Sequence, residues 1–223
     1  MPNDHLDAYR AVRARICAIA TELSADDLAT TVPACPDWTV HDLLAHNVAI
    51  PAAIGASRLP TDGDLQGWLD GLLAERAEQP VEEMVSEWAD LDEVVGGVLS
   101  ATPVLLDDIA VHEHDLRSAV NRPDHAAFDA DRLMPIALEA LAGPAAELGL
   151  GALVVESPEG TWRSHDAEPG WTIRTDAWEA FRAVSSRRSA PELRALPGDG
   201  DPEPFLAVID GHLRLPPVSL REP

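Results

Sequence analysis

The chain has no lysine. All 16 of its basic residues are arginines, against 39 acidic residues, and the formal net charge is −23. Without lysine, a Walker-type phosphate loop and any Schiff-base mechanism are excluded. Such an acidic composition argues against binding to nucleic acid or to anionic membranes, because both depend on basic surface. We therefore expect neither of these partners.

Cysteine is scarce as well, and long apolar runs are missing. Cys17 and Cys35 are too far apart for a Cys-x-x-Cys redox motif and too few for a disulfide framework. The start of the chain has no apolar signal core, and no stretch approaches the roughly 18 apolar residues of a membrane span. These absences favour a cytoplasmic protein. Cys17 fits a helical core pattern. Cys35 lies in a proline-flanked loop, where a reactive thiol is the alternative to an inert one.

The first two-thirds of the chain has the apolar periodicity of helices. A loop with two prolines follows the first helix, and Thr39 and Asp42 then form a variant of the capping box at the start of the second. Pro51 is expected to end that second helix, and Gln79-Pro80 to interrupt the third helical region. The predicted helical segments are 4–23, 39–50, 64–99, 103–122 and 133–148.

After Gly149 the pattern changes to short strands. Residues 153–156 and 161–165 read as a hairpin around the Ser157–Gly160 turn, and a third strand is expected over 171–175 after a turn at Pro169-Gly170. A helix over 176–184 and a short last element near Phe205 follow. The predicted fold is mainly α with a small α+β part: a helical bundle over 1–149 and a small α+β domain over 150–223.

The segment Leu105–Val120 places titratable groups on an apolar helical stripe. Asp108 and Asp115 lie one turn before and almost one turn after His112, on the same face as Leu105, Ile109, Leu116 and Ala119. Charged groups on a core-facing stripe are costly unless they are paired or bind a metal. Asp108 and His112 can therefore be a mutually satisfied pair, or two ligands of a site that binds zinc or a related divalent metal. His114 falls on another face, at the rim.

His46 supplies a third ligand for the metal hypothesis. In the second helix it shares a face with Asp42, Leu43 and Ala49, and so points at least partly inward. Taken alone, it is equally consistent with a hydrogen-bonded core histidine. A bundle, however, brings the inward faces of different helices together. Three protein ligands with one position open are typical of a catalytic zinc site.

Two motifs carry a family resemblance. P-D-W-T-V-H-D-L-L-A-H (36–46), followed by D-I-A-V-H-E-H-D-L (108–116), resembles the mycothiol-dependent maleylpyruvate isomerase family, which has a DinB-like four-helix bundle. W-E-A-F-R-A-V-S-S-R-R-S (178–189) and D-P-E-P-F-L (201–206) resemble its small C-terminal domain. The resemblance implies that His46, Asp108 and His112 bind a divalent metal, usually zinc. Asp108 stands where the family typically has Glu, and His114 where it often has Trp.

The resemblance also implies mycothiol, or another low-molecular-weight thiol, as cosubstrate. The expected activity is thiol transfer or isomerisation of a small electrophile through a metal-bound thiolate, in a monomer or homodimer. By its spacing from His112, Asp115 is expected to assist catalysis by orienting a ligand; the alternative is a surface carboxylate that pairs with a nearby arginine. Arg187 is expected to take part in catalysis, and Arg187 and Arg188 to bind an oxyanion of the substrate or cofactor; the alternative is a solvated turn. A zinc-dependent hydrolase and a non-catalytic metal-binding DinB-like protein are the rival hypotheses.

Overall fold

The computed structural model describes residues 2–61 and 63–220. The chain divides into two compact units, Met1–Pro123 and Asp124–Pro223. The first unit is helical apart from one small hairpin, and the second combines a four-stranded sheet with helices. The predicted fold class, mainly α with a small α+β part, is confirmed.

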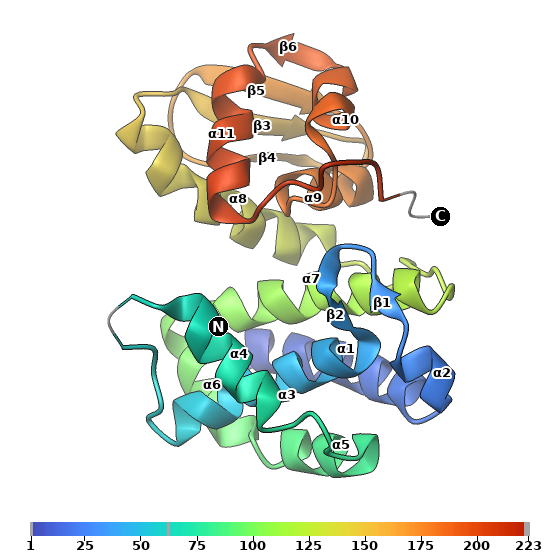
Figure 1. Ribbon diagram of the computed structural model, residues 1–223. Helices are drawn as coiled ribbons and strands as arrows, with labels where there is room; N and C mark the ends of the chain where they lie inside the picture. Colours follow the sequence, from blue (N-terminus) through green and yellow to red (C-terminus); the bar gives the residue numbers. More distant parts are fainter. Residues whose placement is uncertain (1, 62, 221–223) are drawn as a thin grey trace. The chain divides into compact units, whose positions relative to one another are not determined.

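The first unit is a bundle of α1, α3, α6 and α7, with α4 and α5 packed against α3 (Figure 1). The apolar stripes predicted from the sequence form its core, which includes the buried side chains of Ile16, Leu43, Ile109 and Leu116. Its elements are α1 (Pro2–Ala20), α2 (Ala25–Leu28), β1 (Thr31–Val32), β2 (Cys35–Thr39), α3 (Val40–Gly55), α4 (Leu65–Ala74), α5 (Val81–Ala89), α6 (Asp92–Ala101) and α7 (Val104–Ala119).

The capping box predicted at the start of α3 is confirmed. The Thr39 hydroxyl accepts a hydrogen bond from the Asp42 amide, and the Asp42 carboxylate accepts one from the Thr39 amide at 2.9 Å. The predicted end of this helix at Pro51 is wrong, because α3 continues to Gly55. Proline costs the helix one backbone hydrogen bond, but Ala49 and Ala53, on either side of it, are buried against Leu72 of α4. Apolar packing on both sides holds the helix together through the proline.

The proline-containing loop between α2 and α3 forms a small hairpin. β1 and β2 pair antiparallel, with Thr31 opposite Thr39 and Val32 opposite Cys35. Prolines exclude a helix here but are tolerated in edge strands, where one amide faces solvent. The hairpin packs on α3 and α7 and so brings Cys35 and Trp38 to the bundle.

The second unit contains a mixed sheet with the strand order β4-β3-β5-β6 (Figure 1). β3 and β5 are parallel, and the other two pairings are antiparallel. At Gly198 of β6, an added Cβ would collide with the carbonyl oxygen of Thr172, so the close approach to β5 requires glycine. The elements are α8 (Ala130–Glu147), β3 (Ala152–Glu156), β4 (Thr161–Arg163), β5 (Pro169–Arg174), α9 (Ala177–Val184), α10 (Ala190–Ala195), β6 (Gly198–Gly200) and α11 (Glu203–His212).

Two details of this second unit differ from the sequence predictions. Pro169 and Gly170 are the first residues of β5 rather than a turn. Helix α8 packs on α9, α11 and the sheet, and the two units divide after Pro123, whereas the predicted domain boundary lies at residue 149. Within the described ranges no single helix is long and apolar enough to cross a membrane; α6 and α7 reach that length only as a pair bent by 115°.

Candidate metal centre

The three predicted metal ligands lie together in the first unit. His46 comes from α3, and Asp108 and His112 come from α7. Their donor atoms all lie within 4.8 Å of one another. His46 Nε2 is 3.3 Å from Asp108 Oδ2, and His112 Nε2 is 3.6 Å from Asp108 Oδ1. Helix packing has thus brought together residues that are 62 positions apart in the sequence.

These separations suit a shared cation better than direct hydrogen bonds. Nitrogen and oxygen ligands about 2.0–2.2 Å from a tetrahedral zinc are separated from each other by about 3.3–3.5 Å. A nitrogen–oxygen hydrogen bond is usually about 2.9 Å long. The distances from Asp108 to the two imidazoles lie near the first value. The donor set of two imidazoles and one carboxylate therefore fits a divalent metal in both chemistry and spacing.

The other nitrogen of His112 faces Asp115. His112 Nδ1 lies 3.1 Å from Asp115 Oδ2, and the Asp115 side chain is fully buried. An ionised carboxylate only accepts hydrogen bonds, so an ionised Asp115 would keep the His112 proton on Nδ1. This leaves the lone pair of His112 on Nε2, the nitrogen that faces Asp108. A carboxylate on the far side of a histidine ligand fixes its tautomer and raises its basicity.

His46 is positioned differently from His112. Among the described residues, its Nδ1 atom is buried without a hydrogen-bond partner. Its ring lies 4.8 Å from the ring of Trp38 and 4.8 Å from the ring of His112, measured between centroids. Trp38 also lies 5.8 Å from His112. The β2 tryptophan therefore contacts both imidazoles and limits how their rings can rotate.

The site is polar at its centre and accessible at one ligand. His46 and His112 are 5% and 6% exposed, whereas the Asp108 side chain is 33% exposed. Partial exposure of Asp108 leaves a path for a small molecule to approach the ligands.

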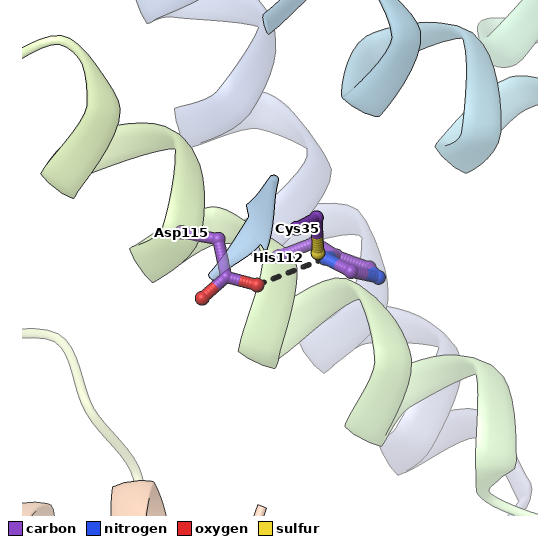
Figure 2. Close-up of side chains that lie close together, drawn as sticks. All are labelled: Cys35, His112 and Asp115. Carbon is purple, nitrogen blue, oxygen red and sulfur yellow. Dashed lines mark hydrogen bonds and ion pairs between the residues drawn. The ribbon is translucent and has the colours of Figure 1, made fainter. Parts of the chain in front are cut away.

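Cys35 is the residue at this site that the sequence pattern did not single out. The hairpin places its sulfur beside the edge of the His112 ring, on the side that faces Asp115 (Figure 2). The only cue in the sequence is that Cys35 directly precedes the P-D-W motif. This cue is weak, because no spacing pattern links Cys35 to the residues of α7. The packing of the β1–β2 hairpin near α7 is a tertiary contact, which the periodicity of the sequence does not predict.

The remaining predicted residues have local roles in the structure. The expectation that His114 lies at the rim is wrong, because its side chain is buried on α7. In the second unit, Arg187 Nη1 donates to the Ser185 carbonyl at 2.9 Å. Arg188 forms two hydrogen bonds with the Glu179 carboxylate, at 2.8 Å and 2.6 Å. The segment 185–189 is thus an ordered turn with internal partners rather than a solvated one.

Fold and site together define a helical-bundle domain with a histidine–aspartate–histidine cluster suited to a divalent metal. Residues 9–104 match the family model of the mycothiol maleylpyruvate isomerase N-terminal domain. This part of the chain is similar to that family's N-terminal domain, as the resemblance implied, and its DinB-like bundle is consistent with the match. No curated protein and no solved structure matches the chain.

The matched region has a clear limit. It includes His46 and the hairpin but ends at residue 104, where α7 begins. The match therefore suggests mycothiol-related, metal-dependent chemistry. The assignment of Asp108 and His112 rests on their geometry in the structure.

Proposed function

We propose that the chain is a metal-dependent enzyme that uses a mycothiol-type thiol and acts on a small electrophile, by thiol transfer or by isomerisation. The observation that carries the proposal is the convergence of His46, Asp108 and His112 in a domain similar to that of the mycothiol maleylpyruvate isomerase family. A divalent metal bound by these residues would supply the means to deprotonate a thiol at neutral pH. Zinc suits this donor set.

The chain's own residues would have three tasks in such a reaction. His46, Asp108 and His112 hold the cation through two neutral imidazoles and one carboxylate. Asp115 keeps the His112 proton on Nδ1, so that Nε2 stays available. Trp38 contacts both imidazoles and would restrict the rotation of their rings. Neither cysteine of the protein is needed as the nucleophile.

The proposed part of Arg187 and Arg188 rests on the chemistry of two neighbouring guanidinium groups in the S-S-R-R-S segment. A guanidinium binds a carboxylate or another oxyanion through two parallel hydrogen bonds. If they bind an anionic group of the substrate or cofactor, Arg187→Gln and Arg188→Gln should raise KM and leave kcat nearly unchanged. Loss of thermal stability with unchanged KM would instead assign the pairing of Arg188 with Glu179 a structural role.

The function is tested by thiol conjugation with zinc-reconstituted protein. Mycothiol or a simpler cysteine-containing thiol is mixed with an electrophilic alkylating dye, and the rate is compared with the same mixture without protein. We expect acceleration that is largest below the thiol's own pKa, because there the uncatalysed thiolate is scarce. His46→Ala should abolish the acceleration, whereas Cys17→Ser should retain it.

Two outcomes would contradict this proposal. Ester or amide hydrolysis that depends on metal but not on thiol would identify a metal hydrolase. Stoichiometric metal binding with no thiol-dependent turnover of any electrophile tried would identify a non-catalytic metal-binding protein.

A further inference from the structure

A second group of metal-ligating side chains adjoins the first. The Cys35 sulfur, His112 and a carboxylate oxygen of Asp115 lie within 4.8 Å of one another. Figure 2 shows the sulfur next to the His112 ring, on the side where the nitrogen faces Asp115. This group and the histidine–aspartate–histidine cluster share His112 but use opposite nitrogens of its ring.

The donor types of the two groups differ in softness. The first group offers two imidazoles and a carboxylate, whereas the second offers a thiol, an imidazole and a carboxylate. A thiolate ligand favours soft, thiophilic cations over hard ones. Around a tetrahedral zinc, a sulfur about 2.3 Å and a nitrogen about 2.0 Å from the metal are about 3.5 Å apart. The donor atoms of this group lie within 4.8 Å of one another, which is compatible with that separation.

Cys35 also lines an acidic cavity. Cys35 and Trp38 line a cavity of about 580 Å³ beside α4. The carboxylates of Asp37, Asp42 and Asp70 line the same cavity. Negative side chains in a concave surface raise the local concentration of cations. Cys35 is therefore one wall residue of a concave surface that attracts positive charge.

We propose that Cys35, Asp115 and Nδ1 of His112 form a second cation site, selective for thiophilic cations, that competes with the first site. The competition follows from the chemistry of imidazole. A neutral ring has one lone pair, so Nδ1 and Nε2 cannot both ligate unless the ring loses its last proton. A cation at Nδ1 moves the ring proton to Nε2 and leaves the first site with His46 and Asp108 alone.

This inference goes beyond the proposed function and does not depend on it. A thiophilic cation at the second site would weaken metal binding at the first site even if the protein catalyses nothing. Conversely, thiol-dependent activity can exist without any second site. The variants His46→Ala and Cys35→Ser separate the two claims, since each removes a ligand from only one site.

The test uses Cd²⁺ titration of the metal-free full-length protein, followed by thiolate-to-metal charge-transfer absorption in the ultraviolet. We expect the absorption in the wild type and in His46→Ala, and its loss in Cys35→Ser and His112→Ala. Cys17→Ser is the matched control and should retain it. Cys17 lies in an apolar environment with Ile16, Leu44 and Val48, and burial raises the pKa of its thiol.

A second measurement does not depend on the fold of a cysteine variant. The alkylation rate of Cys35 is followed by peptide mapping, with and without Cd²⁺. We expect Cd²⁺ to protect Cys35 in the wild type and in His46→Ala, with an apparent affinity about tenfold or more weaker in Asp115→Asn. Charge-transfer absorption that survives Cys35→Ser, or that is lost in Cys17→Ser instead, would overturn the proposal. Absence of both absorption and protection in the wild type would do the same.

Discussion

Helix α7 buries charged groups on two different faces, and the partners of those groups differ in kind. On one face, the 2% exposed Glu113 side chain is held by Arg15 of α1, at 2.8 Å and 2.6 Å, and by Arg117, at 3.0 Å and 2.9 Å. On the other face, Asp115 contacts His112, whose opposite nitrogen faces Asp108.

The difference separates a structural cluster from a metal-type cluster. Arginine is always protonated and has no lone pair to offer, so the Glu113 cluster can only balance charge. Neutral histidine offers a lone pair, so the cluster around His112 can ligate a cation. Burial of a carboxylate therefore does not identify a metal site by itself; the type of its partner does. The predictions below test this contrast, in order of their effect on metal affinity.

The largest effect is expected for His46→Ala. Loss of an outer carboxylate partner typically costs about 10–100-fold in metal affinity, so loss of a direct ligand should cost at least about a hundredfold. Zinc affinity is measured against a competing chelator in a Cys35→Ser background, which isolates the first site. His41→Ala on the same helix is the control, since His41 Nε2 contacts the Gln79 carbonyl at 3.0 Å and lies outside the cluster. Equal losses in both variants would contradict the assignment.

A smaller effect is expected for Asp115→Asn. The amide oxygen can still accept a hydrogen bond from His112 Nδ1, but it carries no charge and no longer raises the basicity of the ring. Zinc affinity should therefore fall about 10–100-fold. The same chelator competition measures it, with circular dichroism to confirm the fold. Unchanged affinity would show that Asp115 does not orient His112.

Asp108→Glu should change affinity by less than about tenfold. The side chain is 33% exposed, so an extra methylene finds room, and the longer side chain retains a carboxylate donor. Tight binding by Asp108→Glu with very weak binding by Asp108→Ala would confirm Asp108 as a ligand. Equal binding by Asp108→Ala and the wild type would remove it from the site.

Glu113→Gln should leave metal affinity unchanged and lower the free energy of unfolding. A neutral amide at this buried position no longer balances the positive charges of Arg15 and Arg117. The free energy of unfolding should therefore fall by about 2–3 kcal/mol. Urea denaturation of the metal-free protein measures this effect. A large loss of zinc affinity with unchanged stability would reverse the roles that we assign to the two faces.

Local chemistry made much of this fold predictable from the sequence. The Thr39–Asp42 capping box fixed the start of α3, and apolar periodicity placed α1, α7 and α8 within a few residues of their observed bounds. Because His46 and the pair on α7 each lie on an inward face, the pattern allowed their convergence, and the family resemblance favoured it over a buried pair and a core histidine.

Features that depend on tertiary packing were not predictable. Pro51 remains inside α3 because Ala49 and Ala53 pack on Leu72, a contact between two helices. Cys35 lies near His112 because the β1–β2 hairpin packs against α7, and no sequence spacing encodes that approach. The amphipathic pattern of α8 predicts which face of the helix is buried, but it does not predict which elements cover that face.

The central claim is tested most directly by the metal content of purified protein, measured by elemental analysis for the wild type, His112→Ala and Glu113→Gln. These two variants change neighbouring residues of one helix, one on each of the contrasted faces. We expect about one divalent metal per chain in the wild type and in Glu113→Gln, and none in His112→Ala. No stoichiometric metal in the wild type after zinc reconstitution, or full metal content in His112→Ala, would contradict it.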